Sequence, residues 1–178
     1  MSDRANTSES RGFTLVELLL VVAIIALLAS IAVPGLMRGR AAANEASAIS
    51  SMRTLLGAQA AYASTCGGGG YASTLDDLAL APTAGGNPFI PADLGAAELG
   101  GTPKSGYVFT ITGGGVPVMA AADTCNGAAD DTTTTFFIQG DPDSPGNTGT
   151  RYFGADESGQ IRQDGAQLAD MLAGIPLQ

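Results

Sequence analysis

The chain has 178 residues, a length that suits one globular domain with an appendage. Its 17 acidic residues against 8 basic ones give a net charge of −9, which argues against nucleic acid phosphates as its main ligand. Histidine is absent, so Ser-His-Asp catalysis, Cys-His catalysis and histidine-ligated metals are excluded.

A long apolar segment follows a polar leader, residues 1–12. Between residues 13 and 37 the polar side chains are those of Thr14, Glu17 and Ser30. As a helix this segment would span about 38 Å, enough to cross a bilayer. A secretory signal would have a shorter apolar core and then a small-residue cleavage site. We therefore predict a membrane-spanning helix at residues 13–37.

Residues 38–64 are predicted to continue this helix as an amphipathic half. Ile49, Met52, Leu56, Ala60 and Ala63 recur at helical spacing and predict the face that packs on a small domain. Polar side chains are expected on the other faces, namely those of Asn44, Glu45, Ser50, Arg53 and Gln59.

The stretch RGFTLVELLLVVAIIALLASIAVPGLMRGRAAANEA resembles the amino-terminal region of type IV pilins and type II secretion pseudopilins. The resemblance covers Arg11 to about Tyr62. It implies an α+β fold, a pilin-like ladle. In that fold one long amino-terminal helix, membrane-spanning and then amphipathic, packs against a small antiparallel β-sheet.

The resemblance also implies processing at the start of the helix. A prepilin peptidase would cut between Gly12 and Phe13, where glycine leaves room for the protease, and would methylate the new amine of Phe13. Glu17 would then pair with the terminal amine of a neighbouring copy and set the register of a filament. The alternative is that the Glu17 carboxylate simply reaches the lipid headgroups.

Pro34 lies inside the predicted helix, where it removes a backbone hydrogen bond and clashes with the preceding turn. A mild kink is therefore predicted there, and the resemblance implies that a nearby segment melts when copies pack. Arg38 and Arg40 follow. They are expected to contact either acidic groups of neighbouring copies or anionic headgroups.

Residues 65–106 are rich in glycine and proline and predict a long connection with short turns. Within it, STLDDLAL predicts a short helix capped by Ser73 or Thr74, with Asp76 and Asp77 in its first turn. Capping and solvation explain the two aspartates better than a metal pair does.

Residues 107–178 are predicted to form an antiparallel sheet of three or four strands. Strands are expected at 107–112, 116–122 and 132–140, with a turn at the glycine triplet 113–115. The segments TRYFGA and GQIRQ predict a further hairpin with Gly159 in its turn. The tail DGAQLADMLAG is expected to form a short helix or to cover a sheet edge.

Two cysteines are present, Cys66 and Cys125. Because the resemblance places the domain outside the cytoplasm, a disulfide between them is expected, with two free thiols as the alternative. A late loop with a calcium site is a property of major pseudopilins, which makes the carboxylates in this region calcium candidates. Turn chemistry explains them equally well, and no other cofactor is expected. The candidates are Asp141, Asp143, Asp156 and Glu157.

These features predict a structural subunit and not an enzyme: a type IV pilin or minor pilin that polymerises through its helix. Expected partners are copies of itself and related pilins, a prepilin peptidase, an inner-membrane assembly platform and, before assembly, membrane lipid. No nucleic acid partner is expected. The chain would be a single-pass inner-membrane protein with its soluble domain outside the cytoplasm, and would then enter an extracellular pilus or a periplasmic pseudopilus. A type II secretion pseudopilin is the alternative, and a membrane-anchored binding module or enzyme is a remote one.

Overall fold

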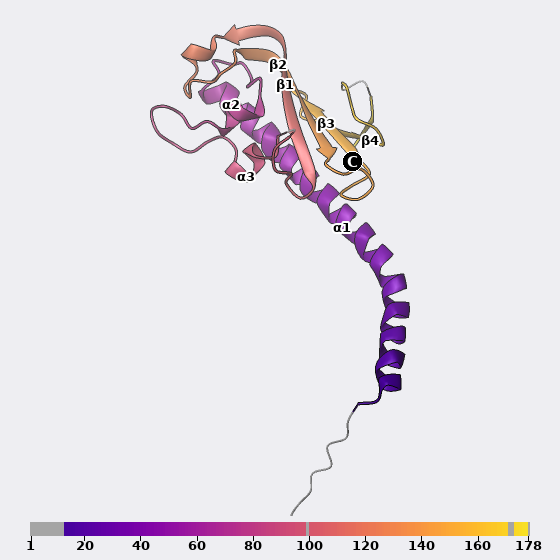
Figure 1. The fold of residues 1–178 in the computed structure, drawn as a ribbon. Coiled ribbons are helices and arrows are strands. Elements are labelled where there is room, and N and C mark those ends of the chain that lie inside the picture. Colours follow the sequence, from indigo (N-terminus) through magenta and orange to yellow (C-terminus); the bar gives the residue numbers. More distant parts are fainter. Residues whose placement is uncertain (1–12, 99, 171–172, 178) are drawn as a thin grey trace, which may run out of the picture. The chain divides into compact units, whose positions relative to one another are not determined.

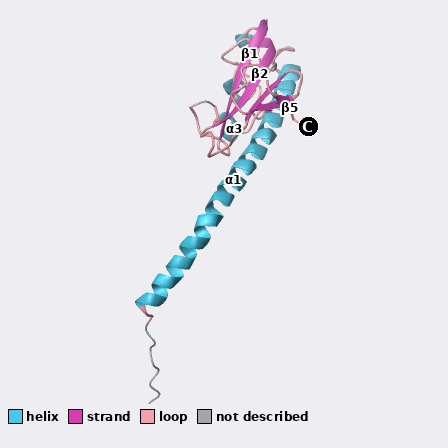
Figure 2. Ribbon diagram, turned by 90° about the vertical axis from the view of Figure 1, so that its right-hand side faces the viewer, coloured by secondary structure: helices cyan, strands magenta, loops and turns pink. Residues whose placement is uncertain are grey.

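The computed structural model describes residues 13–98, 100–170 and 173–177, so Gly12 lies outside the described residues. The chain divides into two compact units, Met1–Arg38 and Gly39–Gln178, and the long helix α1 (Leu15–Thr65) contributes to both. Within the second unit α1 packs against a five-stranded antiparallel sheet (Figures 1 and 2). This arrangement confirms the predicted α+β class.

The sheet is a meander whose strands neighbour one another in the order of the sequence. All four neighbouring pairs are antiparallel, so each connection is local and needs no crossover. The hairpin with Gly159 in its turn is confirmed, and the sheet has one strand more than the three or four expected. The strands are β1 (Tyr107–Met119), β2 (Thr132–Pro142), β3 (Tyr152–Asp156), β4 (Ile161–Asp164) and β5 (Ile175–Pro176).

The glycine triplet does not turn the chain. Strand β1 continues through residues 113–115, so the hairpin predicted there is wrong. The glycines instead allow other segments of the same chain to pack closely against β1. A Cβ on Gly113 would lie 2.5 Å from Ser73 Oγ, and one on Gly114 would lie 2.8 Å from Thr135 Oγ1. Both distances are too short for a side chain. Glycine is therefore required because other residues pack closely against β1, and not because the chain turns there.

Three short helices complete the second unit: α2 (Leu75–Ala79), α3 (Ala92–Gly95) and the 3₁₀ turn η1 (Ala121–Asp123). Thr74 caps α2 as predicted, since its side chain accepts a hydrogen bond from the amide of Asp77 at 3.3 Å. The expectation that Asp77 is solvated is wrong. Its side chain is buried, and its Oδ1 accepts a hydrogen bond from the amide of Ala129 at 2.9 Å.

After β4, the described residues 165–170 and 173–174 of the carboxy-terminal tail form bends and irregular backbone, with no helix among them. Leu168 is fully buried, and a Cβ on Gly154 of β3 would lie 3.1 Å from its Cδ1 atom. The tail therefore packs on the inner strand β3 and not at a sheet edge as expected, and the expected short helix is not found in its described residues.

The face of α1 that packs on the sheet differs from the predicted stripe. Met52 is fully buried as expected, but Ala60 is exposed, and Leu55 and Tyr62 are buried in its place. These side chains meet large residues of the sheet in one continuous core. The fully buried sheet side chains include Tyr107, Phe109, Ile138 and Phe153.

Two polar residues expected on the outer faces of α1 are buried instead. Gln59 is fully buried, and its side-chain amide bonds to the backbone of Ala72 much as a neighbouring strand would. Gln59 Nε2 donates to the Ala72 carbonyl and Gln59 Oε1 accepts from the Ala72 amide, each at 2.9 Å. A buried polar group is tolerated when its hydrogen bonds are made, so Gln59 holds the connection after α1 against the helix.

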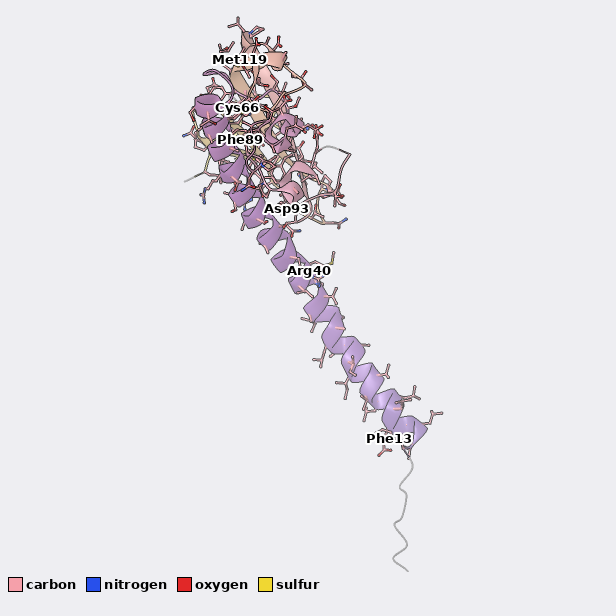
Figure 3. The ribbon with its side chains drawn as sticks, turned by 90° about the vertical axis from the view of Figure 1, so that its left-hand side faces the viewer. Phe13, Arg40, Cys66, Phe89, Asp93 and Met119 are labelled. Carbon is pink, nitrogen blue, oxygen red and sulfur yellow. A yellow bond between two sulfur atoms is a disulfide. The ribbon has the colours of Figure 1, made fainter. Side chains whose placement is uncertain are left out.

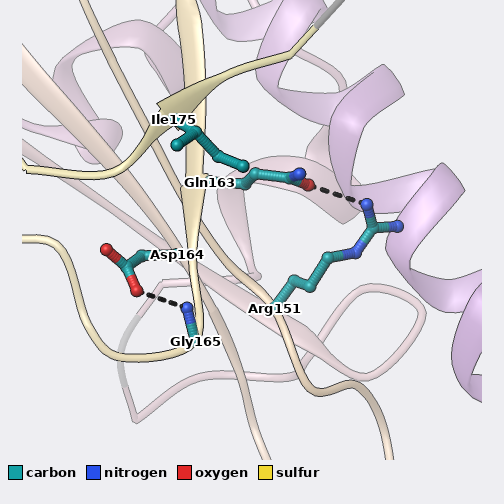
Figure 4. Close-up of a pocket in the computed structure, with 5 residues that line it drawn as sticks. All are labelled: Arg151, Gln163, Asp164, Gly165 and Ile175. Carbon is teal, nitrogen blue, oxygen red and sulfur yellow. Dashed lines mark hydrogen bonds between the residues drawn. The ribbon is translucent and has the colours of Figure 1, made fainter.

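Glu45 is the second buried polar residue on α1. Its Oε1 accepts hydrogen bonds from the amide and hydroxyl of Thr150 at 2.8 and 3.1 Å, and its Oε2 forms an ion pair with Arg151 Nε at 2.7 Å. Arg151 also donates to Gln163 Oε1 at 2.7 Å (Figure 4). Burial raises the pKa of Glu45, but the bonds from Thr150 and Arg151 outweigh burial and hold that pKa below its ordinary value.

Cys66 and Cys125 form a disulfide across a sequence separation of 59 residues. It joins the end of α1 to the segment between β1 and β2. Closing a loop of this length contributes about 4 kcal/mol in the chain-entropy treatment. Thr83 also holds the segment around Cys125, because its amide and hydroxyl both donate to the Cys125 carbonyl at 2.9 Å.

Replacing Glu45 by glutamine should lower the free energy of unfolding by about 2 kcal/mol at neutral pH, because the charged hydrogen bonds are lost. A lowered pKa means that this contribution is complete above the ordinary glutamate pKa of about 4.3 and disappears as pH falls through the folded-state value. Urea unfolding of the detergent-solubilised chain should therefore show wild type and variant converging in acid. A stability difference that stays constant from neutral to strongly acidic pH would contradict this assignment.

Candidate assembly segment

The start of α1 is closed by a pair of reciprocal hydrogen bonds between Thr14 and Glu17. The Thr14 hydroxyl accepts from the Glu17 amide at 3.2 Å, and Glu17 Oε2 accepts from the Thr14 amide at 3.0 Å and from its hydroxyl at 2.7 Å. This is a capping box, in which two amides without a helical partner are satisfied by side chains. The carboxylate in the apolar segment thus has partners in its own chain.

The capping box leaves half of the Glu17 carboxylate available. Both bonds from Thr14 end on Oε2, and Oε1 makes no hydrogen bond with any residue that the structure describes. Glu17 lies in the first turn of the helix. A second donor could therefore reach this carboxylate without breaking the cap.

The first unit exposes an apolar surface on every side of the helix. From Phe13 to Met37 the large apolar side chains are between 47% and 81% exposed, and Figure 3 shows them projecting around the helix. The one hydroxyl in the middle, that of Ser30, donates to the Leu27 carbonyl at 2.7 Å and is satisfied within the helix. By length and composition, α1 qualifies as a membrane span.

Pro34 lies within α1, and the helix continues through it without a break. Gly35 follows in open surroundings, where a Cβ would meet no atom within 4 Å. The helix therefore tolerates the proline in a single chain. The kink and the local melting remain predictions.

The calcium candidates do not converge. Asp141 accepts a hydrogen bond from Gln167, and burial raises the pKa of Asp141, which disfavours its charged form. Asp156 accepts from the amide of Ser158 at 3.0 Å within the β3–β4 turn. In residues 13–98, 100–170 and 173–177 no three His, Cys, Asp or Glu residues form a group that could hold a metal ion.

A surface cavity of about 260 Å³ lies beside β4 and β5 (Figure 4). Its polar groups are already engaged: Arg151 bonds to Gln163, and Asp164 accepts from the amide of Gly165 at 2.6 Å. Ile175 contributes an apolar wall. This lining contains no nucleophile beside an activating base, the arrangement that covalent catalysis requires.

Three residues that form hydrogen bonds important to α1 were not predicted from the sequence. Thr14 was identifiable, because T-x-x-E before an apolar run is the capping-box signature. Glu45 and Gln59 were not, because nothing local distinguishes them from solvent-facing polar residues. Glu45 bonds to Thr150, which lies 105 residues further along the chain, and Gln59 bonds to Ala72, which lies 13 residues further along.

Comparison with known proteins gives two matches, both partial. The family model of the prokaryotic N-terminal methylation motif matches residues 8–33, a range that includes Gly12, Phe13 and Glu17 and ends just before Pro34. A stretch of 76 residues is 36% identical to the type IV major pilin protein PilA of Myxococcus xanthus (strain DK1622). This stretch covers 43% of the present chain and only 34% of the length of that relative. No solved structure matches the chain.

Proposed function

Because this is a type IV pilin-family protein, we propose that it is a subunit of a helical filament, a type IV pilin or minor pilin, and that it polymerises through α1. The observation that most supports this is the apolar first half of α1, which its own chain leaves uncovered. Such a surface needs lipid before assembly and other helices afterwards. A filament of parallel copies supplies those helices.

Processing would prepare the chain for this role. A prepilin peptidase would remove residues 1–12 at the bond between Gly12 and Phe13 and methylate the amine of Phe13. The match to the N-terminal methylation motif, which spans this bond, supports both steps. Cleavage changes the electrostatics of the segment, because it creates a cation at Phe13 where an uncharged peptide bond stood.

Glu17 would then have two roles in sequence. In the single chain it caps α1 together with Thr14. In the filament its Oε1 would accept a hydrogen bond from the amine of Phe13 on a neighbouring copy. An ion pair within apolar surroundings is costly unless both charges are matched, so it would favour one axial position of each new subunit.

Other partners and the location follow from this role. The chain would span the inner membrane once, with the second unit outside the cytoplasm, and an assembly platform in that membrane would transfer it to the filament. The similarity to a type IV major pilin favours a surface pilus over the alternative, a periplasmic pseudopilus of a type II secretion system.

Replacing Glu17 by alanine should leave membrane insertion intact but reduce surface filaments by about tenfold or more, because both the cap and the intersubunit ion pair are lost. The matched control is Thr14→Val, which removes the hydroxyl of the cap and keeps the carboxylate. It should assemble close to the wild-type level. Fibres sheared from cells and measured by gel would separate the two variants. Abundant filaments from Glu17→Ala would overturn the register role.

Replacing Gly12 by valine should block processing, because a branched side chain at the cleavage position hinders approach of the protease to the backbone. The chain should then accumulate in the membrane at its full length. The measurement is the intact mass of the membrane-bound protein. A mass that corresponds to a chain beginning at Phe13 would contradict the proposed cleavage.

A further inference from the structure

Two arginines mark the point where the apolar half of α1 ends. Arg38 and Arg40 follow Met37, the last large apolar side chain of the exposed segment, and both are exposed. The first buried residue of α1 is Glu45, so neither arginine lies in the packed half of the helix. Neither one forms an ion pair with any residue that the structure describes. Both guanidinium groups are therefore available to an external anion.

The spacing of the charges along α1 matches the thickness of a bilayer. The 20 residues 18–37 contain no charged side chain, and the hydroxyl of Ser30 is satisfied by its bond to the Leu27 carbonyl. Glu17 and Arg38 lie 21 positions apart, which is about 32 Å of helix, and the hydrocarbon core of a bilayer is about 30 Å thick. When Glu17 lies at one boundary of this core, Arg38 therefore lies at the other.

The segment that carries the two arginines is also about as long as one headgroup layer is thick. Residues 38–44 separate the apolar half of α1 from Glu45, where the packed half begins, and as a helix they rise about 10 Å. The headgroups on one side of a bilayer occupy about 5–8 Å. Arg38 and Arg40 therefore lie at the depth of the lipid phosphates, and the packed half of the helix begins outside them.

The α1 helices of neighbouring copies offer these arginines no free carboxylate. The acidic residues of α1 are Glu17 and Glu45. Glu45 is buried and already paired with Arg151 at 2.7 Å, and Glu17 is the proposed partner of the Phe13 amine. The two arginines also do not help to orient the chain, because basic residues are favoured on the cytoplasmic side and these would lie on the other. Lipid phosphate is the anion that is present at their depth.

We propose that Arg38 and Arg40 bind the phosphate groups of anionic phospholipids in the outer leaflet of the inner membrane. Each guanidinium presents a planar fork of donors that fits a phosphate, and the negative charge of the lipid adds attraction near the surface. With Glu17 at the inner boundary of the hydrocarbon core, these bonds fix the depth of α1 before assembly. This contact rests on the membrane stage of the proposed function.

Spin-labelled lipids test this contact. The full-length chain is reconstituted into phosphatidylcholine vesicles with a trace of spin-labelled phosphatidylglycerol or spin-labelled phosphatidylcholine, and electron spin resonance measures how much of each lipid the chain immobilises. Wild type should immobilise the anionic lipid in preference to the zwitterionic one. Arg38→Gln combined with Arg40→Gln should lower that preference by about twofold or more. Lysine at both positions should keep most of the preference, because the charges remain.

Arg53→Gln is the matched control. Arg53 is another exposed arginine of α1 without an ion pair to a described residue, but it lies about 20 Å further along the helix than Arg40, beyond the headgroups. Its replacement should leave the preference for the anionic lipid unchanged. The leader arginines Arg4 and Arg11 are present in every variant, so their contribution cancels in the comparison. Rising salt should lower the wild-type preference.

Two outcomes separate this contact from the proposed function. A preference for the anionic lipid that is equal in wild type and in the glutamine variant would overturn the contact alone, and would leave acidic groups of neighbouring copies as the partners of the two arginines. A wild-type chain that immobilises neither lipid would overturn the membrane stage of the proposed function and the contact with it.

Discussion

The first half of α1 cannot remain in water, and the biology of the protein depends on what covers it. Large apolar side chains between Phe13 and Met37 stay mostly exposed in the single chain. Burying each is worth roughly 1.5–3 kcal/mol, so the segment gains on the order of tens of kcal/mol when it enters lipid or a helix bundle. The helix satisfies its own backbone hydrogen bonds, so either environment is open to it.

The second half of α1 has the opposite property, because its own chain covers it. Met52, Leu55 and Tyr62 supply apolar contact with the sheet. Glu45 and Gln59 add hydrogen bonds to the loop before β3 and to the connection after α1, and these bonds hold the helix in one position against both segments. The helix α1 therefore has one half that its own chain covers and one half whose apolar side chains stay exposed.

The sequence predicted the elements that have local causes. The apolar segment, the Thr74 cap of α2 and the hairpin at Gly159 each follow from residues within a few positions of one another. The errors have distant causes. Gly113 stays in strand β1 because it pairs with Phe136 of β2, and Glu45 is buried because Thr150 and Arg151 bond to it. At the start of α1, Glu17 was predicted as a candidate functional residue from the motif, and its bonds to Thr14 became visible only in the structure.

We propose that this chain is processed and then built into a filament, and the composition of isolated surface fibres tests this proposal most directly. Fibres from the native cells would be sheared, purified and digested, and their amino-terminal peptide identified by mass spectrometry. We expect the fibres to contain this chain, beginning with N-methylated Phe13 and including the Cys66–Cys125 disulfide. Fibres without this chain, or a chain that retains residues 1–12 within them, would contradict it.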